Sequence, residues 1–133
     1  MIRILFINAA DSLSEIENRF RPLWPAFLAG YAEKKLGANM FDFRFLTRSL
    51  SIELAKFKPH IVGISAVSQN FNYALRYASI AKKQGAIVIL GGIHISLMPH
   101  NLNQDMDIGV ISEGGKDAHD YAWAEEFRAL AAE

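Results

Sequence analysis

The chain has 133 residues, of which 51% are hydrophobic and 21% charged, and its 14 basic and 14 acidic side chains cancel at pH 7. A chain of this length buries about two-thirds of its surface on folding, which is enough for one hydrophobic core. The balanced charge gives no electrostatic footprint for nucleic acid or an anionic membrane. Cysteine is absent, which excludes disulfides, thiolate metal ligands and iron–sulfur ligation and fits a cytoplasmic location.

In the first half of the chain, strand-length apolar runs alternate with helical patterns. Residues 3–8 form an apolar run, too short to be a signal peptide or a membrane span. The apolar residues of 23–36 recur at helical spacing, with prolines near the start and a glycine after the end. Residues 40–46 alternate apolar and charged side chains, as a half-exposed edge strand does. Ser49 could cap a short helix, which Pro59 would end.

The second half of the chain continues this alternation. Residues 60–65 and 86–92 are apolar enough to be parallel strands that are buried on both faces. Between them, residues 70–84 carry one apolar helical face, and Gly85 follows as a C-cap. The remaining predicted elements are a short helix that contains Pro99, a strand at 108–111, and a last helix through Trp123, Phe127 and Leu130.

This order of elements predicts one α/β domain that covers residues 1–133. Strands joined by helical crossovers form a parallel sheet with helices on both faces. The predicted fold is therefore flavodoxin-like (Rossmann-like): a doubly wound five-stranded parallel sheet in a three-layer α/β/α arrangement. Ligands of such sheets bind at the carboxyl ends of the strands. Function is therefore sought in the loops that follow Ile7, Ile64, Leu90 and Ile111.

These loops lack several familiar kinds of site. The chain has no P-loop sequence, and Asn8-Ala-Ala-Asp-Ser-Leu lacks the glycines of a dinucleotide-binding turn. The four histidines lack the spacing of zinc ligands. Ser65, His94 and Asp11 could be grouped as a triad, but G-x-S-x-G is missing. We therefore predict no catalytic residue, and no residue of the chain is predicted to ligate a metal.

Small residues end three of the predicted strands. Ser65 is followed by Ala-Val-Ser, Gly91-Gly92 ends another strand, and Ser112-Glu-Gly-Gly follows the last one. Without bulky side chains, a large ligand can approach the backbone at these ends. In the simpler alternative, Gly91-Gly92 is only a turn into the next helix, His94 is a polar loop or capping residue, and Glu113 is a solvated loop acid.

Four segments, taken together, resemble a known family. They are Pro22-Leu-Trp-Pro-Ala-Phe-Leu-Ala-Gly-Tyr, Lys58-Pro-His-Ile-Val-Gly-Ile-Ser, Leu90-Gly-Gly-Ile-His-Ile and Val110-Ile-Ser-Glu-Gly. In order and spacing they look like the N-terminal cobalamin (B12)-binding domain of B12-dependent radical-SAM proteins, a group that includes the anaerobic magnesium-protoporphyrin ester cyclases. The resemblance covers nearly the whole chain. It implies a flavodoxin-like domain that holds a corrinoid at the strand ends.

The resemblance also implies which residues contact the cofactor. They fall into a groove for the nucleotide tail of cobalamin, a surface toward the lower corrin face, and a rim. These residues are Ser65, Val67, Gly91 and Gly92 for the groove, Ala9, Ala10 and Asp11 for the lower face, and His94, Glu113 and Gly114 for the rim.

The sequence departs from the family patterns in three places. Cobalamin domains of the methionine-synthase type carry Asp-x-His-x-x-Gly, whose histidine ligates cobalt, but Leu13 stands at that position here. The usual Gly-Glu-Gly-Glu reads Ser112-Glu-Gly-Gly-Lys, without the second carboxylate. There is no C-x-x-x-C-x-x-C, so S-adenosylmethionine and a [4Fe-4S] cluster would belong to a partner radical-SAM domain, in cis or in trans, that is absent from this chain.

Taken together, these features favour a cobalamin-binding domain, itself catalytically silent. It would position a corrinoid for methyl transfer or radical chemistry done with the radical-SAM partner. The main alternative is a degenerate regulatory or protein-interaction module of the same fold without ligand. A third is a small α/β protein for another nucleotide-bearing cofactor. We expect neither a nucleic-acid nor a membrane partner, and the sequence leaves a homo-oligomer open.

Overall fold

Five parallel strands form the sheet of the chain. A computed structural model describes residues 1–10, 23–47, 49–111 and 116–132. The strand order is β2-β1-β3-β4-β5, and each neighbouring pair is parallel. The strands are β1 (Ile2–Asn8), β2 (Phe41–Phe45), β3 (Ile61–Ser65), β4 (Ile87–Gly91) and β5 (Ile108–Gly109). This order is that of flavodoxin-like domains, so the predicted fold class is confirmed.

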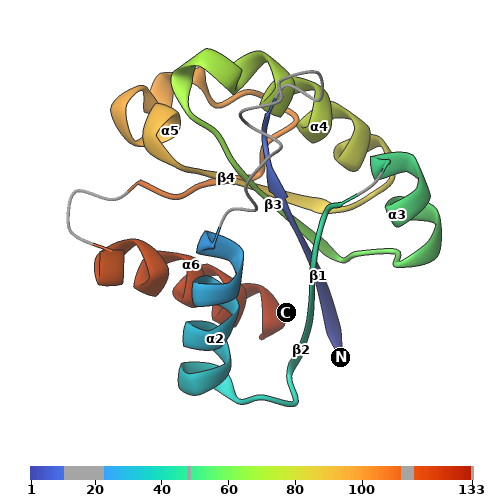
Figure 1. Ribbon diagram of the computed structural model, residues 1–133, viewed down its shortest axis with the longest axis vertical. Helices are drawn as coiled ribbons and strands as arrows, with labels where there is room; N and C mark the ends of the chain where they lie inside the picture. The colour runs from blue at the N-terminus through green and yellow to red at the C-terminus, as the bar shows by residue number, and fades with distance from the viewer. Residues whose placement is uncertain (11–22, 48, 112–115, 133) are drawn as a thin grey trace.

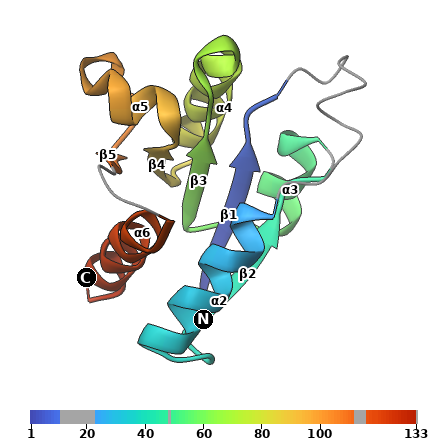
Figure 2. The same ribbon diagram turned by 60° about the vertical axis from the view of Figure 1, so that its left-hand side comes forward.

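Helices cover both faces of the sheet and make three layers (Figures 1 and 2). On one face lie α2 (Trp24–Leu36) and α6 (Lys116–Ala131). On the other face lie α3 (Leu50–Lys56), α4 (Phe71–Lys83) and α5 (Ile93–Leu97). Two short 3₁₀ turns, Ser68–Asn70 and Pro99–Asn101, complete the described elements. The helix predicted around Pro99 is thus divided into α5 and a separate turn.

The core has two halves because successive side chains of a strand point to opposite faces. In β1, Leu5 and Ile7 pack on the side of α3, α4 and α5. Ile4 and Phe6 pack on the side of α2 and α6. The same alternation continues through β3 and β4. The central strands are therefore apolar on both faces, as their sequences predicted.

Aromatic rings fill the half of the core under α2 and α6. Phe6 stacks on Phe43 with 5.5 Å between ring centroids, and it meets Trp24 edge-on at 5.5 Å. Trp123 of α6 lies 6.4 Å from Phe6 and 5.9 Å from Phe127. Ring pairs at these separations stabilise a core by more than the burial of their surface area alone accounts for. The rings therefore attach α2 and α6 to the sheet.

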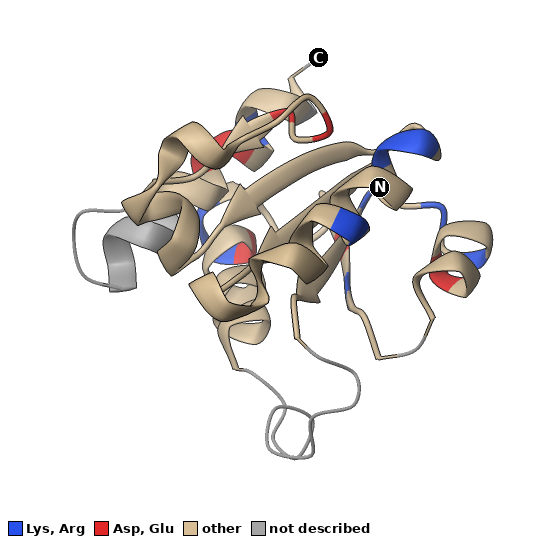
Figure 3. Cartoon of the chain, turned by 90° about the horizontal axis from the view of Figure 1, so that it is seen from above, with Lys and Arg blue, Asp and Glu red and all other residues tan. Residues whose placement is uncertain are grey.

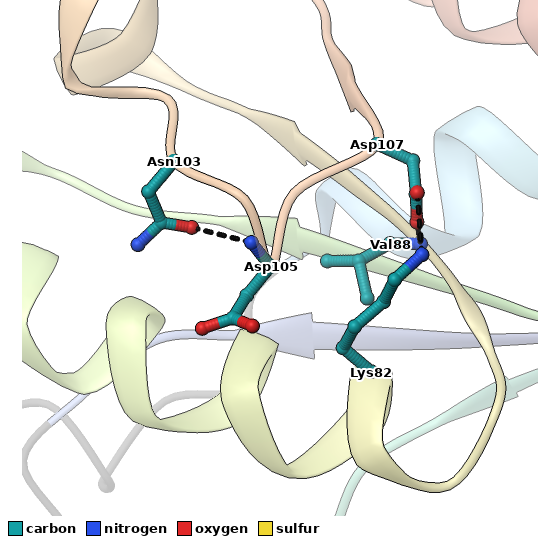
Figure 4. Close-up of polar contacts among 5 residues, drawn as sticks. All are labelled: Lys82, Val88, Asn103, Asp105 and Asp107. Carbon is teal, nitrogen blue, oxygen red and sulfur yellow. Dashed lines mark hydrogen bonds and ion pairs between the residues drawn. The ribbon is translucent and has the colours of Figure 1, made fainter.

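The carboxylate of Asp107, the residue before β5, adds side-chain hydrogen bonds to the backbone pairing of β5 with β4 (Figure 4). Asp107 Oδ2 accepts the backbone N–H of Val88 at 2.8 Å, and Asp107 Oδ1 accepts Lys82 Nζ at 2.6 Å. The N–H of Asp107 also donates to the carbonyl of Val88 at 2.9 Å. Burial raises the pKa of Asp107, but the hydrogen bonds from Lys82 and Val88 outweigh burial and hold that pKa below its ordinary value.

We expect Asp107→Asn to make the fold less sensitive to acid. Because the pKa of Asp107 is lowered by folding, its ionised form stabilises the fold above the ordinary carboxyl pKa. That stabilisation is lost as the pH falls through the lowered pKa. Asp107→Asn should lower the free energy of unfolding by about 1 kcal/mol at pH 7 and by less at pH 3, and urea unfolding at the two pH values measures both losses. Asp105→Asn is the control, and an equal cost of Asp107→Asn at both pH values would contradict the link.

Candidate functional site

The carboxyl ends of β1, β3 and β4 lie side by side. Asn8 pairs with Ser65, and Ser65 pairs with Gly91. The contact continues beyond the strands, because the N–H of Ala9 donates to the Ser65 carbonyl at 2.9 Å and the N–H of Ala66 donates to the Gly91 carbonyl at 3.3 Å. Three of the predicted loops therefore meet at one edge of the sheet.

The described loops at this edge are uncharged. Residues 7–10, 64–75, 91–104 and 108–111 contain no Lys, Arg, Asp or Glu. Figure 3 shows the charged residues elsewhere as short, separate patches of both signs along the ribbon. These described loops therefore offer no Lys or Arg side chain to an anionic ligand.

His94 is a fixed imidazole at this edge. It is the second residue of α5, is only 8% exposed, and stacks on Phe71 with 4.1 Å between ring centroids. Its Nδ1 lies 3.0 Å from Ser68 Oγ, and its backbone N–H donates to the Ala66 carbonyl at 3.3 Å. Its Nε2 is buried and has no hydrogen-bond partner among the described residues. Leaving such a nitrogen unpaired costs about 1–3 kcal/mol, which a ligand could recover.

Gly92 is required by the backbone. Its φ is +97°, a conformation that glycine adopts readily and other residues avoid. A Cβ there would lie 2.7 Å from Ser65 Oγ and 2.8 Å from the Ala66 carbonyl oxygen. Gly92 is the N-cap of α5, so the turn interpretation describes it correctly. The predicted role of Gly92 beside a cofactor tail stays a prediction.

Trp123 covers the bare strand surface at Gly91. A Cβ on Gly91 would lie 2.5 Å from Trp123 Cζ2, and a Cβ on Gly63 would lie 2.8 Å from Trp123 Cζ3. The indole therefore lies across two neighbouring strands and needs a glycine on each. Gly63 was not among the predicted site residues, although a glycine within a buried strand indicates a close approach of another group. The predicted role of Gly91 in a tail groove stays a prediction, and it requires the indole to move.

The other predicted site residues divide into two groups. Ala9 is buried at the edge, Ala10 is partly exposed there, and Val67 is 42% exposed. The predicted contacts Asp11, Glu113 and Gly114, like Leu13, lie outside the described residues. Within the described residues, no group of three His, Asp or Glu side chains could hold a metal ion.

Comparison with known proteins identifies the domain. A family model described as "B12 binding domain" matches residues 11–120. The chain belongs to the B12-binding domain family. It is also 32% identical over 123 residues to the anaerobic magnesium-protoporphyrin IX monomethyl ester cyclase of Rubrivivax gelatinosus. The match covers 85% of this chain and 22% of that relative, so this B12-binding domain spans about a fifth of the cyclase.

These matches confirm the resemblance that the four sequence motifs indicated. No solved structure matches the domain significantly. Among the described residues, no helix is both long enough and apolar enough to span a membrane. The cytoplasmic location of the domain stays a prediction.

We expect Gly91→Ala to destabilise the domain through Trp123. The added Cβ overlaps the rigid indole, which typically costs about 1–3 kcal/mol. In a Trp123→Leu background, Gly91→Ala should lower the free energy of unfolding by less than half as much, because the overlapping ring is gone. Thermal and urea unfolding of the four proteins in this double-mutant cycle give both costs.

Gly30→Ala in α2 is the matched control. A Cβ at Gly30 meets nothing within 4 Å, so this substitution should stabilise the helix by about 0.5–1 kcal/mol in either background. Equal costs of Gly91→Ala with and without Trp123 would contradict the assigned contact.

Proposed function

We propose that the chain binds a corrinoid over the carboxyl edge of β1, β3 and β4 and presents it to a radical-SAM domain. The observation that carries this proposal is the B12-binding family match, because residues 11–120 include the loops after β3 and β4. When bound, the corrinoid supplies methyl-transfer or radical chemistry, and the protein supplies binding and orientation. We expect this chain alone to be catalytically silent.

The partner domain is proposed from the relative. This chain corresponds to 22% of the cyclase, which leaves most of that protein for other domains. We place S-adenosylmethionine and the [4Fe-4S] cluster in such a partner, because this sequence has no cysteine. Whether the partner is in cis or in trans does not alter the role of the binding edge.

The carboxyl edge suits the ring of a corrinoid. The corrin of cobalamin is a broad ring that carries neutral amide side chains around its periphery. At the edge, Val67 and Ile93 expose 42% and 60% of their surface, and the described loops carry no charge. The proposed contacts are Ala9, Ala10, Ser65, Val67, Gly92 and His94, with Asp11, Glu113 and Gly114 outside the described residues.

His94 is proposed to bind a corrin amide through Nε2. Ser68 and Phe71 already hold the ring, so little rotational freedom is lost on binding. An amide offers both a donor and an acceptor, so it can pair with either tautomer of the imidazole. A small shift of α5 or of the loop after β3 would expose Nε2 to the ligand.

A second candidate function is a module of the same fold that has lost its ligand. One observation favours it: Trp123 fills the surface beside Gly91 that was predicted to accept the cofactor tail. Another nucleotide-bearing cofactor is less favoured, because the family model that matches the chain describes B12 binding.

Titration with hydroxocobalamin, followed by the absorption spectrum and equilibrium dialysis, tests the proposal. We expect saturable binding of one corrinoid per chain. His94→Phe keeps a ring on Phe71 and removes both nitrogens, so it should weaken binding about tenfold, or about 1.4 kcal/mol. His100→Phe is the control at an exposed histidine and should leave the affinity unchanged.

Absence of corrinoid binding by the folded wild-type chain would reject the proposal in favour of the module without ligand. Equal affinities of His94→Phe and the wild type would reject the role of His94 alone.

A further inference from the structure

The sheet surface under Trp123 is shaped for a flat bicyclic ring. Ser65 pairs with Gly91, and Gly63 lies two residues before Ser65 on the same face of β3. The floor under the indole is therefore bare backbone at the two glycines, with the side chains of Ile89 and Ser65 beside them on the same face. The benzimidazole base of the cobalamin tail, like an indole, is a fused five- and six-membered aromatic ring system. One floor could therefore accept either ring.

In this chain the floor is already occupied. The indole of Trp123 is fully buried, and a Cβ at either glycine would come within 3.0 Å of its ring carbons. The rings of Phe6, Trp24 and Phe127 surround the indole, with centroid separations of 6.4, 6.3 and 5.9 Å. A close-packed interior has no room for a second bicyclic ring at this position.

We propose that Trp123 occupies the place of the tail's base, so that the chain binds corrinoids by their ring and not by their nucleotide tail. The inference rests on the proposed function, that the chain binds a corrinoid at the carboxyl edge. It assigns Trp123 as the residue that sets corrinoid specificity. The ligand class is then any corrinoid with an intact ring, including cobinamide, which lacks the nucleotide tail.

The first test compares cobalamin with cobinamide by equilibrium dialysis. The wild-type chain should bind the two with affinities within about threefold of each other. Trp123→Ala vacates the floor, so this variant should prefer cobalamin by tenfold or more while its affinity for cobinamide stays unchanged. Phe127→Leu is the matched control, because it shortens a ring in the same helix and cluster and leaves the indole on the glycines.

The second test needs no corrinoid. Removing a buried ring from a close-packed core leaves a cavity that can bind a small apolar molecule. Free benzimidazole at millimolar concentration should therefore raise the melting temperature of Trp123→Ala and leave the wild type and Phe127→Leu unchanged. Trp123→Leu, which fills part of the space, should respond less and serves if the alanine variant does not fold.

The outcomes separate this inference from the proposed function. A wild-type chain that prefers cobalamin by tenfold or more binds the tail, which overturns the role of Trp123 and leaves the proposed function intact. The inference also fails if Trp123→Ala and Trp123→Leu, both folded, gain neither cobalamin preference nor stabilisation by benzimidazole. If the wild type binds neither corrinoid, both the proposed function and the inference are rejected.

Discussion

The parallel pairing of β1, β3 and β4 places the loops after these strands at one edge of the sheet. Parallel strands need crossover helices, and those helices bury both faces of the sheet. The carboxyl ends are then where the central strands leave the two packed faces and continue into loops. The edge that gathers Ala9, Ser65 and Gly92 is therefore a consequence of the same pairing that builds the core.

Local patterns were sufficient to predict the fold. The apolar runs at 60–65 and 86–92 correspond to β3 and β4 within a residue at each end, because a strand buried on both faces has no polar position. The last strand was predicted at 108–111 but spans Ile108–Gly109. An edge strand pairs on one side only, and Asp107 supports this one through a hydrogen bond from the Val88 N–H that no local pattern indicates.

Local sequence patterns could not predict the contacts that define the site. Gly91 was predicted to leave open space, and the residue that fills it, Trp123, stands 32 positions later in the sequence, on helix α6. Ser68 and Phe71 were not predicted as partners of His94, because their contact depends on how α4 and α5 meet the loop after β3. Which side chain covers a glycine is decided by packing, not by periodicity.

Two kinds of glycine thus stand next to each other at the end of β4. Gly92 is needed by its own backbone conformation, whereas Gly91 is needed by an indole.

In our account, a corrinoid lies over the carboxyl edge while the indole of Trp123 stays in place. A crystal structure of the chain with cobalamin tests this arrangement most directly. We predict the corrin ring over Val67 and His94, with Trp123 still against Gly63 and Gly91. A benzimidazole base on those glycines, with the indole displaced, would contradict the claim.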